Sequence, residues 1–299
     1  MPTERAKTVV TTGAALTAFA ANSLLCRRAL GHTALDAPSF STIRLASGAL
    51  VLYLIVRARR DGAPLAGSWG SAAMLFLYAV PFSLAYVSLG AGTGALILFG
   101  AVQSTMLAVA LATGERPHPL QWTGLMLALS GLVYLVLPGL TAPSAAGAAL
   151  MALAGVSWGV YSLRGRRASN PLAETAGNFL RSVPMAAAVS LAAATHARWD
   201  VAGAILAIVS GAVASGLGYV AWYAALGHLT ATRAATVQLA VPVIAAAGGV
   251  LLLAEPISAR LILAAVLILG GVGLALLRTA PRRPRPLQPP THPSPERAP

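Results

Sequence analysis

Long apolar stretches recur along the whole chain, and short segments rich in proline, glycine and charged residues separate them. Each stretch is near the 20 residues that a helix needs to cross about 30 Å of hydrocarbon. The stretches are continuously apolar and do not alternate with polar positions, which disfavours membrane-spanning strands. The pattern predicts ten helices, near 8–26, 39–57, 69–89, 93–113, 121–138, 145–164, 173–195, 202–226, 230–252 and 259–278.

Composition makes the class of protein specific. Hydrophobic residues are 57% of the chain and charged residues 10%, against roughly 25% charged in a typical soluble domain. A soluble protein of this size needs a charged surface that this chain cannot supply. We therefore expect an all-α polytopic membrane protein. The first span follows Arg5 and Lys7 like a signal peptide, but the many similar spans after it favour a retained helix.

The basic residues predict an orientation in the membrane. With the N-terminus inside, 14 of the 21 Lys and Arg residues fall on the cytoplasmic side, four on the outer side and three within spans. Basic loops of membrane proteins stay in the cytoplasm. We therefore expect an inner-membrane protein with both termini in the cytoplasm. The same rule explains the net charge of +13 without nucleic acid. Residues 279–299 are rich in proline and arginine and predict a disordered cytoplasmic tail.

The chain repeats itself at an offset that increases from 134 to 140 residues. The matching pairs are GAAL at 13–16 and 147–150, Arg44 and Arg181, Glu115 and Glu255, and Gly131 and Gly271. The pattern predicts two five-helix repeats, at 1–140 and 141–278. Because five is odd, the second repeat enters the membrane from the opposite side. Inverted repeats are typical of transporters that work by alternating access.

Three stretches carry a resemblance to a known family. Each half ends in an apolar helix, a turn containing glutamate and a glycine-rich last helix, as in "TGERPHPLQWTGLMLALSGL" and "LAEPISARLILAAVLILGGVG". Together with "PVIAAAGGVLLLAEP" at 242–256, they resemble the EamA-type members of the drug/metabolite transporter superfamily. The resemblance implies a ten-helix, two-repeat metabolite transporter. In length, and in the aromatic content of its third, sixth and eighth spans, the chain is most similar to a bacterial aromatic amino-acid exporter of that superfamily.

Aromatic and amide side chains within the spans are the candidate substrate contacts. Tyr78, Phe82 and Tyr86 lie on one face of the third span, although Tyr86 and Tyr223 also fit a belt at the membrane interface. In the family, the third, sixth and eighth helices line a central cavity. Amides within spans face protein or water rather than lipid. The expected substrate-binding residues are Tyr78, Trp158, Tyr161, Tyr219, Trp222, Asn22, Gln103 and Gln238.

Charged residues within the spans are few. Arg44 and Arg181 can pair with backbone carbonyls, reach the interface, or meet a substrate carboxylate. Glu255 and Glu115 are interpreted as structural turn residues that water or a neighbouring helix N-terminus stabilises. No carboxylate lies in the middle of a span, where proton relays place one. We therefore hypothesise facilitated transport without obligatory proton exchange, with Glu174 at a cavity mouth as the one exception to test.

The predicted function is export of small amphipathic metabolites, including aromatic amino acids, through a cavity between the repeats. The alternative is a sugar-phosphate or nucleotide-sugar exchanger of the same superfamily, which should carry several basic residues in one cavity. A membrane enzyme is disfavoured because no histidine or aspartate lies within a span to assist a nucleophile. A scaffold would not need an inverted repeat. No catalytic residue, metal or cofactor is expected; the expected partners are a small-molecule substrate and the lipid bilayer, and the sequence is compatible with a monomer.

Three prolines are expected to kink helices. Pro81, Pro184 and Pro242 lie inside the predicted spans, where proline removes a backbone hydrogen bond. Small residues at 210–218 are spaced by four and predict close helix packing rather than chemistry.

Overall fold

The computed structural model describes residues 2–59, 64–112, 119–137, 142–165, 168–226, 228 and 237–276. In these residues the chain forms ten long helical segments, which confirms the predicted fold class. They are α1 (Pro2–His32), α2 (Ala37–Ala58), α3 (Trp69–Tyr86), α4 (Ala91–Ala112), α5 (Pro119–Val136), α6 (Ala145–Gly165), α7 (Pro171–Ala192), a continuous segment of α8 (Val201–Val209), η2 (Ser210–Leu217) and α9 (Gly218–Leu226), α11 (Ala240–Leu253) and α12 (Ala259–Leu276). A single 3₁₀ turn, η1 (Ala194–His196), follows α7.

Polar residues between the apolar stretches determine where several helices begin. The side chains of Asp36, Ser68, Asn170 and Asp200 each accept a hydrogen bond from a backbone N–H in the first turn of α2, α3, α7 and α8. Such caps satisfy donors that a helix start otherwise leaves unpaired. The segments that separate apolar runs in the sequence are therefore also the helix starts.

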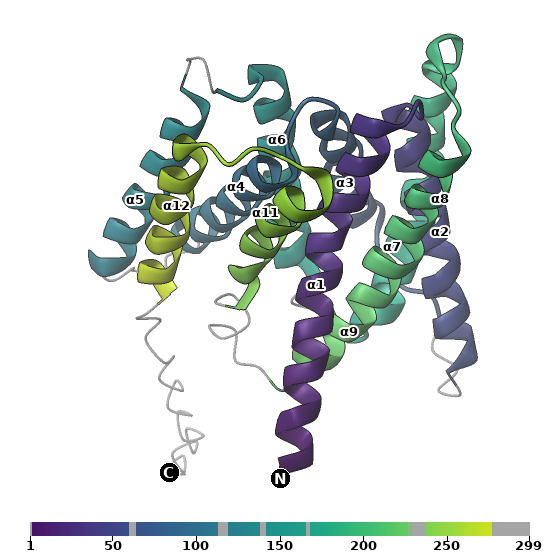
Figure 1. Ribbon diagram of the computed structural model, residues 1–299. Helices are drawn as coiled ribbons and strands as arrows, with labels where there is room; N and C mark the ends of the chain where they lie inside the picture. Colours follow the sequence, from purple (N-terminus) through teal and green to yellow (C-terminus); the bar gives the residue numbers. More distant parts are fainter. Residues whose placement is uncertain are drawn as a thin grey trace, which may run out of the picture.

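The helices pack as two equivalent halves. In chain order, α1 to α5 correspond to α6, α7, α8–η2–α9, α11 and α12. Contacts between the halves have equivalents: α3 packs against α6 as α8–η2–α9 packs against α1, and α4 packs against α6 as α11 packs against α1. The pairs α2–α7, α4–α11 and α5–α12 join equivalent helices. Figure 1 shows α5 beside α12 at one edge, α2 with α7 and α8 at the other, and α1 between them.

The α5–α12 pair carries one of the predicted repeat matches. A Cβ atom at Gly131 would lie 2.6 Å from the Cβ of Leu267, and a Cβ at Gly271 would lie 2.5 Å from the backbone of Ala128. Both glycines therefore allow close approach of the same two helices. Two residues matched by the sequence repeat occupy equivalent places in the structure.

The outer surface of the bundle is apolar. Leu251, Leu252 and Val266 are 80%, 71% and 62% exposed, which reverses the arrangement of a soluble protein and suits contact with lipid. Five helical segments are long and apolar enough to cross a membrane within the described residues: Ala6–His32, Ala37–Ala58, Trp69–Tyr86, Ala145–Gly165 and Val201–Ala225. Helix α7 is more polar, and it packs against α2 and α3.

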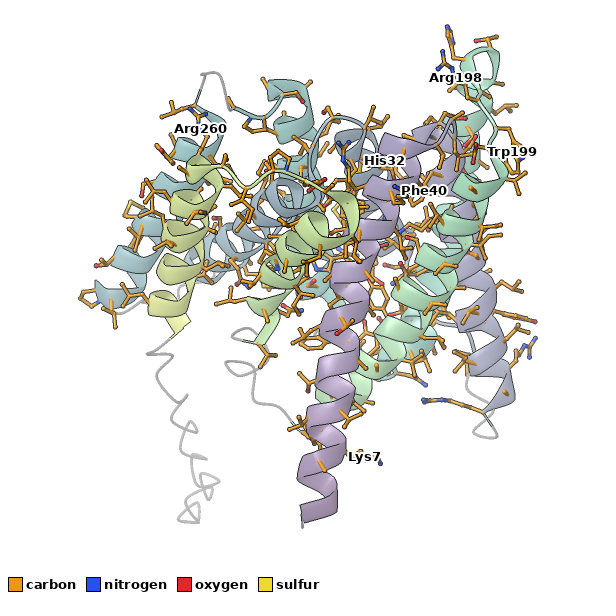
Figure 2. All side chains as sticks on the ribbon, in the orientation of Figure 1. Lys7, His32, Phe40, Arg198, Trp199 and Arg260 are labelled. Carbon is orange, nitrogen blue, oxygen red and sulfur yellow. The ribbon has the colours of Figure 1, made fainter. Side chains whose placement is uncertain are left out.

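The chain enters and leaves the bundle at the same end, where α1 begins and α12 ends (Figure 1). Figure 2 shows Lys7 at this end and His32, Arg198 and Arg260 at the opposite end. This arrangement follows from an even number of spans. Which end faces the cytoplasm stays a prediction.

Two sequence expectations are wrong in detail. The first concerns α1, which continues to His32, so Arg27 and Arg28 belong to the helix and not to an outer loop. The three prolines lie where they were expected. Pro81 and Pro184 lie inside α3 and α7, and Pro242 follows a break in the helical pattern at Leu239, with Val237 and Gln238 helical before it and α11 after it.

The second correction concerns Tyr86, which does not belong to an interfacial belt. Its side chain is fully buried and its hydroxyl donates to the carbonyl of Ala91 at 3.3 Å. The small residues of 210–217 pack against α2 and α1, as expected. Glu115, Arg233, the tail 279–299 and the boundary between residues 140 and 141 lie outside the described residues.

Candidate functional site

A central cavity lies between the two halves. Helices α1 to α4 supply one side of it, and α6, η2, α9 and the residues before α11 supply the other. Its lining residues are Phe19, Asn22, Ser23, Arg44, Tyr78, Phe82, Leu98, Phe99, Trp158, Ala214, Ser215, Tyr219 and Gln238. The cavity measures about 30 Å³, which is room for about two water molecules. Side chains must therefore move before a metabolite enters.

Aromatic rings form a continuous wall of this cavity. The ring centroid of Trp158 lies 4.8 Å from that of Tyr78 and 5.5 Å from that of Tyr219, in tilted orientations. Phe19 meets Tyr219 edge-on at 5.9 Å. These distances are typical of favourable aromatic pairs. Helices α1 and α3 of one half and α6 and α9 of the other thus bring rings together that can stack on an apolar or aromatic ligand.

Polar groups cross the cavity from one half to the other. Asn22 Nδ2 donates to the hydroxyl oxygen of Tyr78 at 3.2 Å, and Ser210 Oγ donates to Asn22 Oδ1 at 2.6 Å. Arg44 Nη2 donates to the same Tyr78 oxygen at 3.0 Å. Since that oxygen accepts both bonds, the Tyr78 hydroxyl hydrogen can donate to a third group. The site therefore offers a neutral donor beside a cation.

The sequence left three roles open for Arg44: pairing with carbonyls, reaching the membrane interface, or meeting a substrate carboxylate. It is 2% exposed, so it does not reach the interface, and Nε and Nη1 have no protein partner among the described residues. Its guanidinium lies 4.9 Å from the ring centre of Phe82 and 5.2 Å from that of Tyr78. Arg181 pairs with backbone carbonyls, because its Nη1 donates to the carbonyls of Ala66 and Gly177.

The π-helical segment η2 places small residues at the cavity. Ser210 bonds Asn22, and Ala214 and Ser215 line the wall. A π-helix widens the turn, and such segments often occur at functional sites. A Cβ at Gly211 would lie 2.0 Å from the carbonyl oxygen of Arg44. The glycine therefore lets η2 cross α2 at the residue that carries the cavity cation.

Five of the eight predicted residues line the central cavity: Asn22, Tyr78, Trp158, Tyr219 and Gln238. The other three do not. Trp222 packs edge-on against Phe19 at 5.8 Å. Gln103 lies in α4 with its Nε2 buried and unpaired among the described residues. Substrate binding stays a prediction for all eight.

Tyr161 is the remaining predicted residue outside the central cavity. It lines a second and smaller cavity of about 10 Å³, which is near the minimum for one water molecule. Glu174, Thr175, Asn178 and Tyr223 contribute to it. The hydroxyls of Thr175 and Tyr223 are hydrogen-bonded at 3.0 Å. Tyr223 therefore has a protein partner, and Glu174 lines this second cavity and not the central one.

Sequence reasoning missed Phe19 and Ser215 and left Arg44 undecided. Phe19 precedes Asn22 by three residues in α1, so the two share a helix face, a signal that could have identified it. Ser215 had no such signal, because its direction depends on the π-helical turn. The described residues contain no group of three or more His, Cys, Asp and Glu side chains that could hold a metal ion.

Comparison with known proteins identifies the family. Residues 145–277 match the EamA-like transporter family. An uncharacterised protein of Pseudomonas aeruginosa, PA1977, is 53% identical over 283 residues, which cover 94% of this chain and 97% of that protein. A solved crystal structure of a protein with 20% sequence identity covers 91% of this chain and 97% of its own, with a TM-score of 0.64, and supports the fold alone. The ten-helix chain, whose two halves enclose a central cavity, thus belongs to the EamA-like transporter family and is a multi-pass membrane transporter of the drug/metabolite transporter superfamily.

Proposed function

We propose that the protein exports small amphipathic metabolites, amino acids including aromatic ones, by alternating access through the central cavity. The observation that carries the proposal is the aromatic wall of Tyr78, Trp158 and Tyr219, with Asn22 at its edge. Aromatic rings bind apolar side chains and amides bind polar groups, so the wall suits a molecule that has both. The narrower likeness to aromatic amino-acid exporters is part of this proposal.

Alternating access is supported by the equivalence of the halves. Pairs such as α2–α7 and α4–α11 can exchange roles at the two ends of the bundle when one half changes conformation. The cavity of about 30 Å³ corresponds to a closed conformation in this proposal. We further propose an inner-membrane location, both termini in the cytoplasm, and function as a monomer.

A sugar-phosphate or nucleotide-sugar exchanger is the weaker candidate. Such ligands carry several negative charges and need several cations in one site. Among the described residues that line the central cavity, Arg44 is the one Lys or Arg. A single cation suits a ligand with a single negative charge.

The test is transport in proteoliposomes that contain the purified full-length chain. Labelled phenylalanine, tryptophan and leucine are compared with glucose 6-phosphate and a nucleotide sugar, each with and without protein. We expect saturable movement of the aromatic amino acids above protein-free vesicles. Movement of the phosphorylated sugars without any amino acid would contradict the proposal and favour the exchanger.

A further inference from the structure

Arg44 is a buried cation that has no ion-pair partner among the described residues. Its side chain is 2% exposed, and it uses one N–H to bond the Tyr78 hydroxyl oxygen at 3.0 Å. Arginine has five N–H donors; Nε and Nη1 have no partner in the described part of the chain. Within the described residues, one ion pair is present, between Arg27 and Glu255, and Arg44 is not part of it.

The neighbours of Arg44 stabilise the charge only in part. The rings of Phe82 and Tyr78 lie within 5.2 Å of the guanidinium carbon, which gives a favourable cation–π contact. This contact does not replace the hydration that burial removes, and a buried charge is stable only when it is paired. An anion in the cavity would satisfy the free donors.

Arg181, the repeat counterpart, is half-buried and bonds to the protein itself. Its Nη1 donates to the carbonyls of Ala66 at 2.8 Å and Gly177 at 2.9 Å, and it does not line the cavity. Arg164, which is exposed, donates to the hydroxyls of Ser71 and Ser68. Arg44 differs from both because it is fully buried, lines the central cavity and has two nitrogens without a partner among the described residues.

We infer that Arg44 is the docking site for the single carboxylate of the substrate, an inference that rests on the proposed function and names its substrate class. A guanidinium binds a carboxylate through two parallel N–H···O bonds, and Nε and Nη1 of Arg44 have no partner among the described residues. The substrate's apolar or aromatic part then lies against Trp158 and Tyr219, across the cavity. The preferred ligands are aromatic monocarboxylates, and the corresponding amides are poor ligands.

The first test is calorimetric binding to the detergent-purified full-length chain. L-Phenylalanine and L-phenylalaninamide differ at the carboxyl group, and we expect the acid to bind about tenfold more tightly or better. Arg44→Met should abolish this preference, and Arg44→Lys should keep part of it. Arg57→Met is the matched control, because Arg57 is exposed and stacks on Tyr53 at 5.4 Å; it should keep the full preference.

The outcomes separate this inference from the proposed function. Equal binding of acid and amide by the unmodified chain would overturn the role of Arg44 and leave amino-acid transport standing. Binding of neither compound would contradict the aromatic amino-acid proposal, and the carboxylate inference would fall with it.

The second test does not need a ligand. Because Arg44 is an unpaired buried charge, Arg44→Met should unfold at the same or a higher temperature than the unmodified chain. Arg181→Met should unfold at a lower temperature, because it loses two bonds to backbone carbonyls. A clear loss of thermal stability in Arg44→Met would mean that Arg44 is a structural residue, and would overturn the inference.

Discussion

The carboxylate of Glu255 caps the first residue of α4: the backbone N–H of Ala91 lies 2.8 Å from Oε2 and 3.0 Å from Oε1. Arg27 Nε lies 3.2 Å from the same carboxylate, and Arg27 Nη1 donates to the carbonyls of Tyr86 and Val87. The cluster joins the ends of α1 and α3, the start of α4 and the turn after α11. This confirms that Glu255 is a structural turn residue stabilised by a helix N-terminus.

Glu255→Gln should therefore destabilise the protein. The change removes the negative charge at the positive end of a helix and weakens two charge-assisted contacts. With side chains 22% and 17% exposed, we expect a loss of about 1–3 kcal/mol, measured as a lower unfolding temperature in detergent. Combined with Arg27→Gln, the double variant should lose less than the sum. An unchanged unfolding temperature in Glu255→Gln would contradict the cap.

Gly211→Ala should weaken the contact between α2 and η2. The new Cβ would lie 2.0 Å from the carbonyl oxygen of Arg44, so the helices must separate, at a cost of about 1–3 kcal/mol. Gly13→Ala is the matched control, because nothing lies within 4 Å of its added Cβ. Replacing glycine there should raise stability by about 0.5–1 kcal/mol. Thermal unfolding of both variants checks the pair, and equal effects would argue against this crossing.

Trp158→Ala should slow transport of aromatic substrates several-fold while the protein stays folded. Ring stacking contributes about 0.5–1.5 kcal/mol beyond area burial, which sets this scale. Trp122→Ala is the control, because Trp122 is 45% exposed on the outside of α5. Initial transport rates in proteoliposomes measure the effect. The same rate for both variants would place the Trp158 ring outside the substrate path.

The topology can be tested with single cysteines at Ala112 and Ser258 after Cys26→Ala. These positions lie at opposite ends of the bundle, since α4 runs 22 residues from the Glu255 cluster to Ala112, about 33 Å. We expect a membrane-impermeant maleimide to label Ser258→Cys from outside and Ala112→Cys only from the cytoplasmic side. The unmodified chain should label poorly, because Cys26 is fully buried. Labelling of both positions from one side would contradict the inverted repeat.

Transport should proceed without obligatory proton exchange. The described residues that line the central cavity include no carboxylate and no histidine, the groups that titrate most readily near neutral pH. A pH gradient of one unit can support roughly a tenfold accumulation ratio for one coupled proton; we expect a ratio near one for a neutral substrate in sealed vesicles. Accumulation that the gradient drives and Glu174→Gln abolishes would contradict the uncoupled mechanism.

The number and places of the helices follow from the sequence, because apolar length and capping residues are local properties. The ends of α2, α6 and α12 lie within two residues of expectation. The end of α1 was misplaced because Arg27 and Arg28 look like a loop. In the fold, Arg27 is held by Glu255, 228 residues away, and no local pattern reports that partner.

The site divides in the same way. Periodicity along single helices identified Tyr78, Trp158 and Tyr219 as candidates. Only the packing of α3, α6 and α9 places the Trp158 ring centroid 4.8 Å from that of Tyr78 and 5.5 Å from that of Tyr219. Arg44 and Arg181 are equivalent in the repeat, yet one lines the cavity and the other binds two carbonyls. The sequence determined which side chains lie within the membrane; tertiary structure decided what each one faces, because a partner depends on helix rotation and crossing, which spacing along one helix does not specify.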